Sequence, residues 1–321
     1  MTEQRRANGS LRHLLTLEGL SRDELEMLLE RAQHFVRPRG AHSPRSNVLA
    51  GLTVANLFTE PSTRTRVSFE LAAKRLGADV VNLEMQLSSR VKGESMLDTV
   101  FTLESLHVDV FVVRDAEAGV PALVADNVGG NVSVLSAGEA HVSHPTQGLL
   151  DALTILQHKQ RCDGLAVAIV GDIRHSRVAR SAYQALHTLG VGELRIVAPP
   201  ALMPPAGEFA GCVRHERIEP GLRDADVVMM LRIQRERFSD VAIPAGDEYF
   251  RQFGLTPERL ALARPDAIVM HPQPMNRGVE IDSTVADGPH SVIRDQVANG
   301  VAVRMAVLET LAARPMTGWS P

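Results

Sequence analysis

Short apolar runs of strand length alternate with helical patterns along most of the 321-residue chain. The runs lie at residues 52–58, 80–83, 108–113 and 132–135, and the alternation resumes with a run at 165–170. A strand that is followed by a helix and then by another strand returns to the same sheet in parallel orientation. The sequence therefore predicts an α/β fold built from parallel sheets.

A polar stretch at residues 158–163 interrupts this alternation and divides it into two α/β units. A chain of this length suits two domains, each large enough to bury its own core. We therefore expect two doubly wound parallel-sheet domains with the active site between them. The first would span residues 1–150, completed by a C-terminal helix at 295–321, and the second would span residues 151–294.

The composition excludes several classes of function. The chain has 34 Lys and Arg against 38 Asp and Glu, a net charge of −4, which argues against a general binder of the nucleic acid backbone. Aromatic residues make up only 4%, too few for a base-stacking platform. Two isolated cysteines, Cys162 and Cys212, indicate a reducing cytoplasm rather than a disulfide framework. No signal peptide or membrane span is expected.

Arginine or histidine follows nearly every predicted strand. In open parallel sheets, ligands bind outside the carboxyl ends of the strands. Charges scattered over a surface would not gather at these positions, so the pattern predicts a site for anionic ligands. The residues that carry it include Arg64, Arg66, Arg114, Arg177, Arg232 and His271.

The segment Ser62-Thr-Arg-Thr-Arg66 lies between a predicted strand and a predicted helix. Its hydroxyl and backbone N–H groups would gather at a helix N-terminus, where the helix dipole favours a phosphate dianion. Arg64 and Arg66 add planar guanidinium groups, each of which can bind two phosphate oxygens at once. The alternative is a simple helix cap with two solvated arginines, but five consecutive donor-rich residues favour an anion site.

His144-Pro-Thr-Gln147 places an imidazole just before a helix and an amide in its first turn. The two groups could stabilise negative charge on a carbonyl oxygen. Taken alone, such a histidine is more often a helix cap. Lys92-Gly93-Glu94 follows a polar loop that is either simply exposed or closes over an anionic substrate.

Several common kinds of active site are missing from the sequence. There is no His-Glu-x-x-His metal motif, no Gly-x-Ser-x-Gly nucleophile elbow and no Walker loop. A dinucleotide fingerprint is absent as well, which argues against a nicotinamide dehydrogenase. We therefore expect no metal and no cofactor. Arg177, Arg232 and Gln234 suit carboxylate ligands instead.

Three motifs, Ser62-Thr-Arg-Thr-Arg66, His144-Pro-Thr-Gln147 and His271-Pro-Gln-Pro274, occur in an order that resembles the aspartate and ornithine carbamoyltransferase family. The resemblance extends over residues 11–311. Within the family, the second motif, Lys92-Gly93-Glu94 and Arg232-Ile-Gln234 resemble the enzymes that act on aspartate. The ornithine enzymes usually carry cysteine where this chain has Thr146 and Pro272.

The resemblance implies transfer of the carbamoyl group from carbamoyl phosphate to the amine of L-aspartate in de novo pyrimidine (UMP) biosynthesis. The products would be N-carbamoyl-L-aspartate and phosphate. An enzyme of this family acting on ornithine or N-acetylornithine is the nearest alternative. An inactive scaffold is disfavoured, because the cationic residues that the family uses are all present.

By position, the resemblance also assigns site residues. The phosphate would be bound by Ser62, Thr63, Arg64, Thr65 and Arg66. The carbamoyl group would be bound by Arg114, His144, Gln147 and the backbone of Gln273 and Pro274. Aspartate would be bound by Lys92, Arg177, Arg232 and Gln234. Catalysis would rest on Arg64, Thr65, His144 and Lys92.

The resemblance further implies a catalytic homotrimer in which Ser88 and Lys92 reach into a neighbouring subunit's site. The resemblance is compatible with a trimer alone and with a larger assembly that includes regulatory or dihydroorotase-like subunits. Arg174 and His175 stand where some relatives carry a Lys-Tyr-containing segment, so they could change aspartate affinity or the coupling of the domains.

Overall fold

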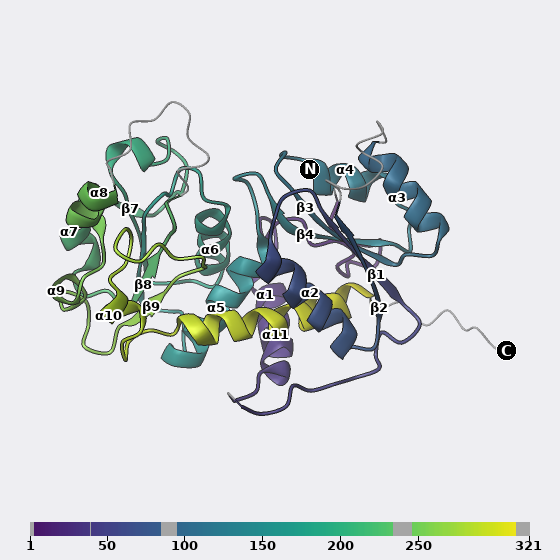
Figure 1. The fold of residues 1–321 in the computed structure, drawn as a ribbon, viewed down its shortest axis with the longest axis horizontal. Helices are drawn as coiled ribbons and strands as arrows, with labels where there is room; N and C mark the ends of the chain where they lie inside the picture. Colours follow the sequence, from purple (N-terminus) through teal and green to yellow (C-terminus); the bar gives the residue numbers. More distant parts are fainter. Residues whose placement is uncertain (1–2, 39, 85–94, 234–245, 313–321) are drawn as a thin grey trace. The chain divides into compact units, whose positions relative to one another are not determined.

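The computed structural model describes residues 3–38, 40–84, 95–233 and 246–312 (Figure 1). The chain divides into two compact units. Unit 1 contains Met1–Gly19, Asp23–Thr146 and Asn299–Pro321, and unit 2 contains Leu20–Arg22 and Gln147–Ala298. Each unit has its own sheet and its own core.

Unit 1 is built on a four-stranded parallel sheet of order β2-β1-β3-β4. Its strands are β1 (Thr53–Phe58), β2 (Asp79–Glu84), β3 (Val110–Asp115) and β4 (Ser133–Glu139). Its helices are α1 (Arg22–Phe35), α2 (Thr63–Arg75), α3 (Met96–Ser105) and α4 (Val120–Asn127). Helix α11 (Ile293–Ala312) brings the C-terminal part of the chain to this unit from residue 299 onward.

Both faces of the unit 1 sheet are buried at strands β1, β3 and β4, whereas the edge strand β2 has exposed residues such as Val81. On one face, side chains such as Leu57 and Phe111 pack against residues of α3 and α4 in a single apolar cluster. On the other face, α2 contributes Phe69, which is 0% exposed. This burial explains the nearly uninterrupted apolar strands, since a strand covered on both sides has no solvent face to keep polar.

Helix α3 begins with a capping box, a reciprocal pair of hydrogen bonds at the helix N-terminus. Ser95 is its N-cap and accepts a hydrogen bond from the backbone N–H of Asp98. The Asp98 carboxylate accepts in return from the Ser95 backbone N–H, at 3.2 Å. This reciprocal pair satisfies two N–H groups at the helix start and sets where α3 begins.

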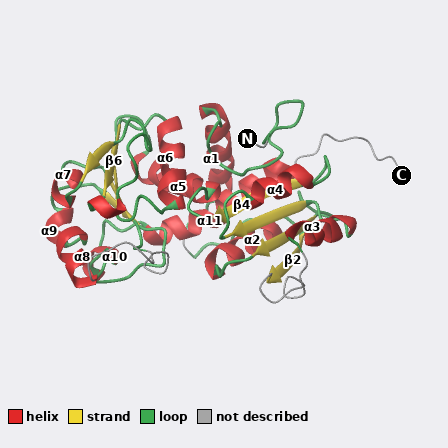
Figure 2. Cartoon of the chain, turned by 90° about the horizontal axis from the view of Figure 1, so that it is seen from above, coloured by secondary structure: helices red, strands yellow, loops and turns green. Residues whose placement is uncertain are grey.

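Unit 2 is built on a five-stranded parallel sheet of order β7-β6-β5-β8-β9. Figure 2 draws the helices of this unit in red and its strands in yellow. Its strands are β5 (Ala166–Val170), β6 (Glu193–Val197), β7 (Val213–His215), β8 (Val227–Met230) and β9 (Ile268–Met270). The longer helices of this part are α5 (Pro145–Lys159), α6 (Arg177–Thr188) and α8 (Gly246–Phe253). Short helices are α7 (Ile218–Leu222), α9 (Pro257–Leu260), α10 (Ser283–Ala286) and the 3-10 turn η2 (Pro200–Leu202).

The predicted fold class, two α/β domains with parallel sheets, is confirmed. The apolar patterns did not predict the short elements α4, β7, α7, α8 and α10. Three of these are five residues or fewer, and a segment of that length shows no clear periodicity. No helix among the described residues is both long and apolar enough to cross a membrane.

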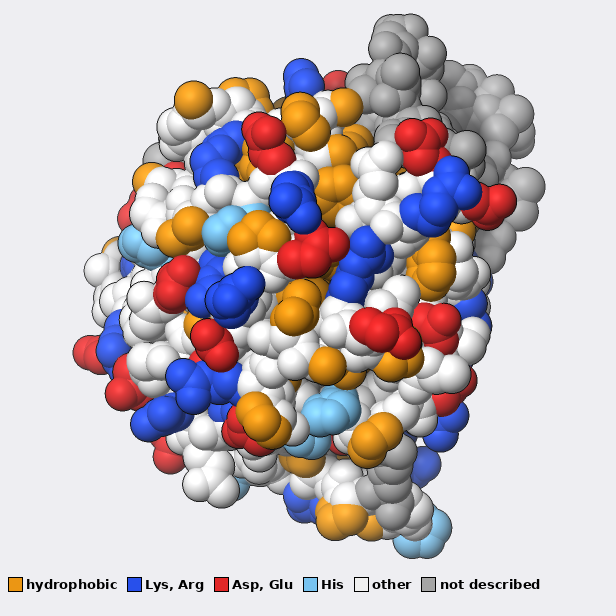
Figure 3. Space-filling view, turned by 90° about the vertical axis from the view of Figure 1, so that its left-hand side faces the viewer, with side chains coloured by type: hydrophobic (Ala, Val, Ile, Leu, Met, Phe, Trp, Pro, Cys, Tyr) orange, Lys and Arg blue, Asp and Glu red, His pale blue; other side chains and the backbone are white. Residues whose placement is uncertain are grey.

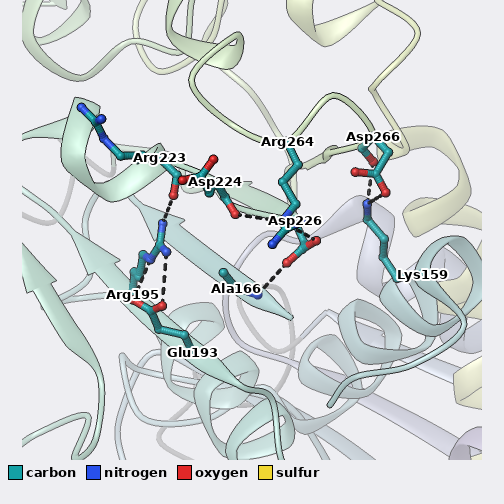
Figure 4. A network of polar contacts seen from close by, with 9 residues as sticks. All are labelled: Lys159, Ala166, Glu193, Arg195, Arg223, Asp224, Asp226, Arg264 and Asp266. Atoms are coloured by element: carbon teal, nitrogen blue, oxygen red, sulfur yellow. Dashed lines mark hydrogen bonds and ion pairs between the residues drawn. The ribbon is translucent and has the colours of Figure 1, made fainter. Parts of the chain in front are cut away.

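The amino ends of the unit 2 strands carry charges that pair with one another (Figure 4). The Arg195 guanidinium donates to the Glu193 carboxylate at 2.9 Å and to the carbonyl oxygen of Gly221 at 3.1 Å. Asp226 accepts from the backbone N–H of Ala166 at 2.8 Å. Because the charges at this edge pair with one another and stabilise the fold, we expect a ligand site at the opposite, carboxyl edge of the sheet.

Candidate active site

The start of α2 holds the strongest candidate for an anion site. Ser62 is the N-cap residue, but its hydroxyl accepts no hydrogen bond from the helix. The first turn contains no acidic residue, although acidic side chains are the usual partners of a helix N-terminus. The start of a helix presents N–H groups that have no carbonyl partner within the helix, and these suit a ligand that brings its own negative charge.

Two arginines stand in this same first turn. Arg64 is exposed and Arg66 is half-buried. A cation near the positive end of the helix dipole is unfavourable by a few tenths of a kcal/mol or more, about 0.3–1. A phosphate bound here would be attracted both by the helix N-terminus and by the two guanidinium groups, so this arrangement favours anion binding over a purely structural role.

Arg114 lies at the carboxyl end of β3, next to the end of β1, since Phe58 and Arg114 are partners in the sheet. Its Nε lies 2.8 Å from the Glu60 carboxylate, and one terminal nitrogen donates to the carbonyl oxygen of Ala137 at 3.1 Å. The side chain is only 11% exposed. Glu60 and Ala137 thus hold the Arg114 guanidinium in one orientation at the carboxyl edge of the sheet.

His144 and Gln147 lie at the start of α5, as predicted. His144 is 4% exposed and directly precedes Pro145, the first residue of the helix. The Gln147 amide nitrogen donates to the Asp151 carboxylate at 2.9 Å. Because the nitrogen is engaged, the amide oxygen of Gln147 is the atom oriented away from Asp151 and able to accept a hydrogen bond.

In unit 2, the predicted carboxylate ligands follow two neighbouring strands. Arg177 is the first residue of α6 after β5, and Arg232 follows β8, the strand paired with β5. A Cβ at Gly171 would lie 2.9 Å from the carbonyl oxygen of Leu231, so glycine is required where the two strand ends meet. Arg177 is 6% exposed. The structure therefore brings both arginines to the same edge of the unit 2 sheet.

The segment between β5 and α6 also contains Arg174 and His175. Arg174 is exposed, and His175 is half-buried. The His175 ring Nδ1 and its backbone N–H both lie about 3 Å from one oxygen of the buried Asp172 carboxylate, at 3.0 and 3.1 Å. His175 is thus held against Asp172, whereas Arg174 is directed to solvent.

The third motif forms a turn after β9. Gln273 adopts a left-handed backbone conformation, with φ of 59°, and the Gln273–Pro274 peptide bond is cis. The Gln273 backbone N–H donates to His271 Nδ1 at 2.9 Å. Because His271 is fully buried, this hydrogen bond anchors the turn to the interior of unit 2.

Sequence reasoning missed Glu60 and Asp151, which orient two predicted site residues. Asp151 could have been found, since Gln147 and Asp151 are four residues apart on one helix and such pairs bond to each other. The role of Glu60 depends on the pairing of β1 with β3, which the sequence does not show. Ser88, Lys92 and Gln234 lie outside the described residues.

Neither a metal site nor a cysteine nucleophile emerges from the described part of the chain. It contains no group of three or more His, Cys, Asp or Glu side chains that could hold a metal ion. Burial raises the pKa of the Cys212 thiol to about 11, which keeps the thiol protonated, and Cys162 is buried. On the face drawn in Figure 3, positive and negative side chains are interspersed rather than gathered into a basic patch.

Two parts of the chain match the two domains of one known protein family. Residues 12–157 match the carbamoyl-P binding domain of aspartate/ornithine carbamoyltransferases, and residues 163–311 match the Asp/Orn binding domain of the same proteins. The chain belongs to the aspartate/ornithine carbamoyltransferase family. It is therefore a member of an enzyme family that transfers carbamoyl groups.

Solved structures of other carbamoyltransferases share this fold. Aspartate transcarbamoylase from Trypanosoma cruzi in complex with carbamoyl phosphate and aspartate is 31% identical, with a TM-score of 0.83, over 94% of this chain and 97% of that one. Ornithine carbamoyltransferase from Thermus thermophilus is 28% identical, with a TM-score of 0.82, over 94% of this chain and 99% of that one. The similarity thus extends to both acceptor classes within the family.

Proposed function

We propose that this carbamoyltransferase uses L-aspartate as its acceptor and forms N-carbamoyl-L-aspartate and phosphate. The observation that carries the proposal is the pair Arg177 and Arg232, which follow neighbouring strands of unit 2. Aspartate presents two carboxylates, and each can be bound by one guanidinium. Ornithine presents one carboxylate and an ammonium group, which would call for an acidic partner instead. Gln234 is proposed to add an amide contact.

The donor, carbamoyl phosphate, is proposed to bind to unit 1. Its phosphate would accept hydrogen bonds from the start of α2, with Ser62, Thr63, Arg64, Thr65 and Arg66 as donors. Arg114, held by Glu60, and His144 would donate to the carbamoyl oxygen. From unit 2, the Gln147 amide oxygen and the backbone at Gln273 and Pro274 would accept from the carbamoyl NH₂ group.

The reaction follows from these contacts. The neutral amine of aspartate attacks the carbamoyl carbon, and its electron pair forms the new C–N bond. The C–O bond to the phosphate then breaks, and phosphate leaves with that electron pair. Arg64, Thr65 and His144 would stabilise the oxyanion formed on the way, which is worth about 3–4 kcal/mol for one such donor. The departing phosphate accepts the proton that the amine loses, so no separate general base is needed.

The acceptor specificity is tested by offering the purified protein L-aspartate, L-ornithine and N-acetyl-L-ornithine in turn with carbamoyl phosphate. We expect N-carbamoyl-L-aspartate to form with kcat/KM at least about 100-fold above that for either other amine, since a missing charge partner costs about 3 kcal/mol. Product identification by mass spectrometry is the measurement. Turnover of only the other two amines would overturn the proposal.

We also propose the assembly that the sequence implies, a cytoplasmic homotrimer acting in pyrimidine biosynthesis, with Ser88 and Lys92 contributed across subunits. Lys92→Ala and His144→Ala should each inactivate the enzyme, but mixing them in equal amounts should restore activity. If each site takes His144 from one subunit and Lys92 from its neighbour, about a quarter of all sites are intact after random exchange of the subunits. Lack of any recovery, with subunit exchange verified by mass spectrometry, would argue against sharing.

A further inference from the structure

A chain of buried hydrogen bonds in unit 2 connects the two elements proposed to contact the carbamoyl NH₂ group. One end is the Gln147 amide on α5. The other is the turn at Gln273 and Pro274 after β9. The side chains between them are Asp151, Gln296, His271 and Glu280, which we call the buried polar chain.

The first half of the buried polar chain joins α5 to α11 and β9. Asp151 accepts from the Gln147 amide at 2.9 Å and from the Gln296 amide at 2.7 Å, both on the same oxygen. The Gln296 amide oxygen accepts from the backbone N–H of His271 at 3.0 Å. Asp151 is 0% and Gln296 1% exposed, so these bonds are shielded from water.

The second half fixes the turn. His271 Nδ1 accepts from the Gln273 backbone N–H at 2.9 Å, so the ring proton is on Nε2. That Nε2–H donates to Glu280 at 3.2 Å, and the same carboxylate oxygen accepts from the backbone N–H of Asn276. Glu280 therefore sets the His271 tautomer, and the tautomer lets the ring accept from Gln273.

The surroundings of Glu280 keep this arrangement rigid. Both His271 and Glu280 have fully buried side chains. Tyr249 on α8 is fully buried too, and its burial, together with the nearby Glu280 and Asp172 carboxylates, raises the pKa of its phenol. Where water is excluded, a hydrogen bond that is lost cannot be replaced by solvent.

We propose that Glu280 and Gln296 are positioning residues, which hold the Gln147 amide and the Gln273–Pro274 backbone at a fixed spacing. This spacing would let both elements contact the carbamoyl group, so that the protein binds carbamoyl phosphate more tightly than inorganic phosphate. This proposal rests on the proposed function, because it assumes that these two elements bind the carbamoyl group. A left-handed Gln273 is itself unfavourable and persists only where its surroundings hold it. The bond to His271 supplies that support.

The test measures the Kd of carbamoyl phosphate and of inorganic phosphate by calorimetry at one pH, and takes their ratio as the carbamoyl selectivity. Glu280→Met removes the acceptor for His271 and Asn276 and should reduce the selectivity by about 10- to 100-fold. The Kd of phosphate should change by less than about twofold, because the phosphate donors lie in unit 1. Gln296→Met should act in the same direction and serves if Glu280→Met does not fold.

Two controls separate positioning from general damage. Glu280→Gln keeps an acceptor oxygen and should keep the selectivity within about threefold of wild type. Glu193→Met breaks the ion pair with Arg195 at the opposite edge of the same sheet and should leave the selectivity unchanged. Equal losses in Glu280→Met and Glu280→Gln, or none in Glu280→Met and Gln296→Met, would overturn the inference. A wild-type protein that does not prefer carbamoyl phosphate to phosphate would instead refute the proposed function.

Discussion

Replacing Arg64 with alanine is expected to lower kcat/KM for carbamoyl phosphate by about 10³-fold or more while the protein stays folded. Arg64 is the second residue of α2 and is exposed, so its side chain contributes little to the core. In the proposed reaction, Arg64 binds the phosphate and stabilises the negative charge that develops on it as it leaves. The loss should therefore appear in kcat as well as in KM.

Steady-state kinetics and the Kd of inorganic phosphate measure this effect. Lys74→Ala is the matched control, since Lys74 is a cation on the same helix, paired with Glu70 at its far end. Ten residues of helix separate it from Arg64 by about 15 Å, too far to contact the same ligand. Turnover of Arg64→Ala within threefold of wild type would show that the anion site has been assigned to the wrong residues.

Replacing Phe69 with alanine is expected to destabilise unit 1 by about 3–5 kcal/mol. Phe69 anchors α2 to the sheet and is 0% exposed. The Arg304 guanidinium of α11 lies 4.8 Å from the centre of its ring, and Arg304 is only 4% exposed. The substitution would thus leave a cavity and remove the aromatic face from a buried cation, which is worth up to about 2 kcal/mol more.

Equilibrium unfolding in urea, followed by far-UV circular dichroism, measures the change. The control is Val67→Ala on the same helix, because Val67 is 44% exposed and should cost less than about 0.5 kcal/mol. A similar midpoint for both variants would contradict the assignment of Phe69 to the core. Loss of helix anchoring should also weaken phosphate binding, since the donors of the proposed anion site are one turn away.

Strand and helix periodicity predicted the long elements well. Strand β1 begins one residue after the predicted run at 52–58, and α6 lies within the predicted 176–189. Such elements bury whole faces, and burial is what makes a repeating apolar pattern visible. Helix α8 carries only two buried side chains, Tyr249 and Phe253, and that signal is too weak to read along the chain.

The residues of the candidate site also fall into two groups, those that the sequence predicted and those that it did not. The donor-rich Ser62-Thr-Arg-Thr-Arg66 segment and the His144-Pro-Thr-Gln147 segment are local, so their placement at helix starts followed from the sequence. Glu60, Gln296 and Glu280 act on residues that are distant in the chain or lie on another strand. No spacing rule relates Glu60 to Arg114 or Gln296 to Asp151, because those pairs exist only after the strands and helices have packed.

The amino-acid sequence was enough to predict the kind of fold and the chemical types that gather at the ends of the strands, because both depend on neighbouring residues along one chain. It also carried the family motifs. The orientation of the individual atoms of those residues became clear from the folded structure. The Gln147 nitrogen is turned toward Asp151, and His271 is held as the tautomer that supports Gln273. Such orientations depend on buried partners from distant segments, and the direction of a hydrogen bond is fixed only when both of its partners are in place.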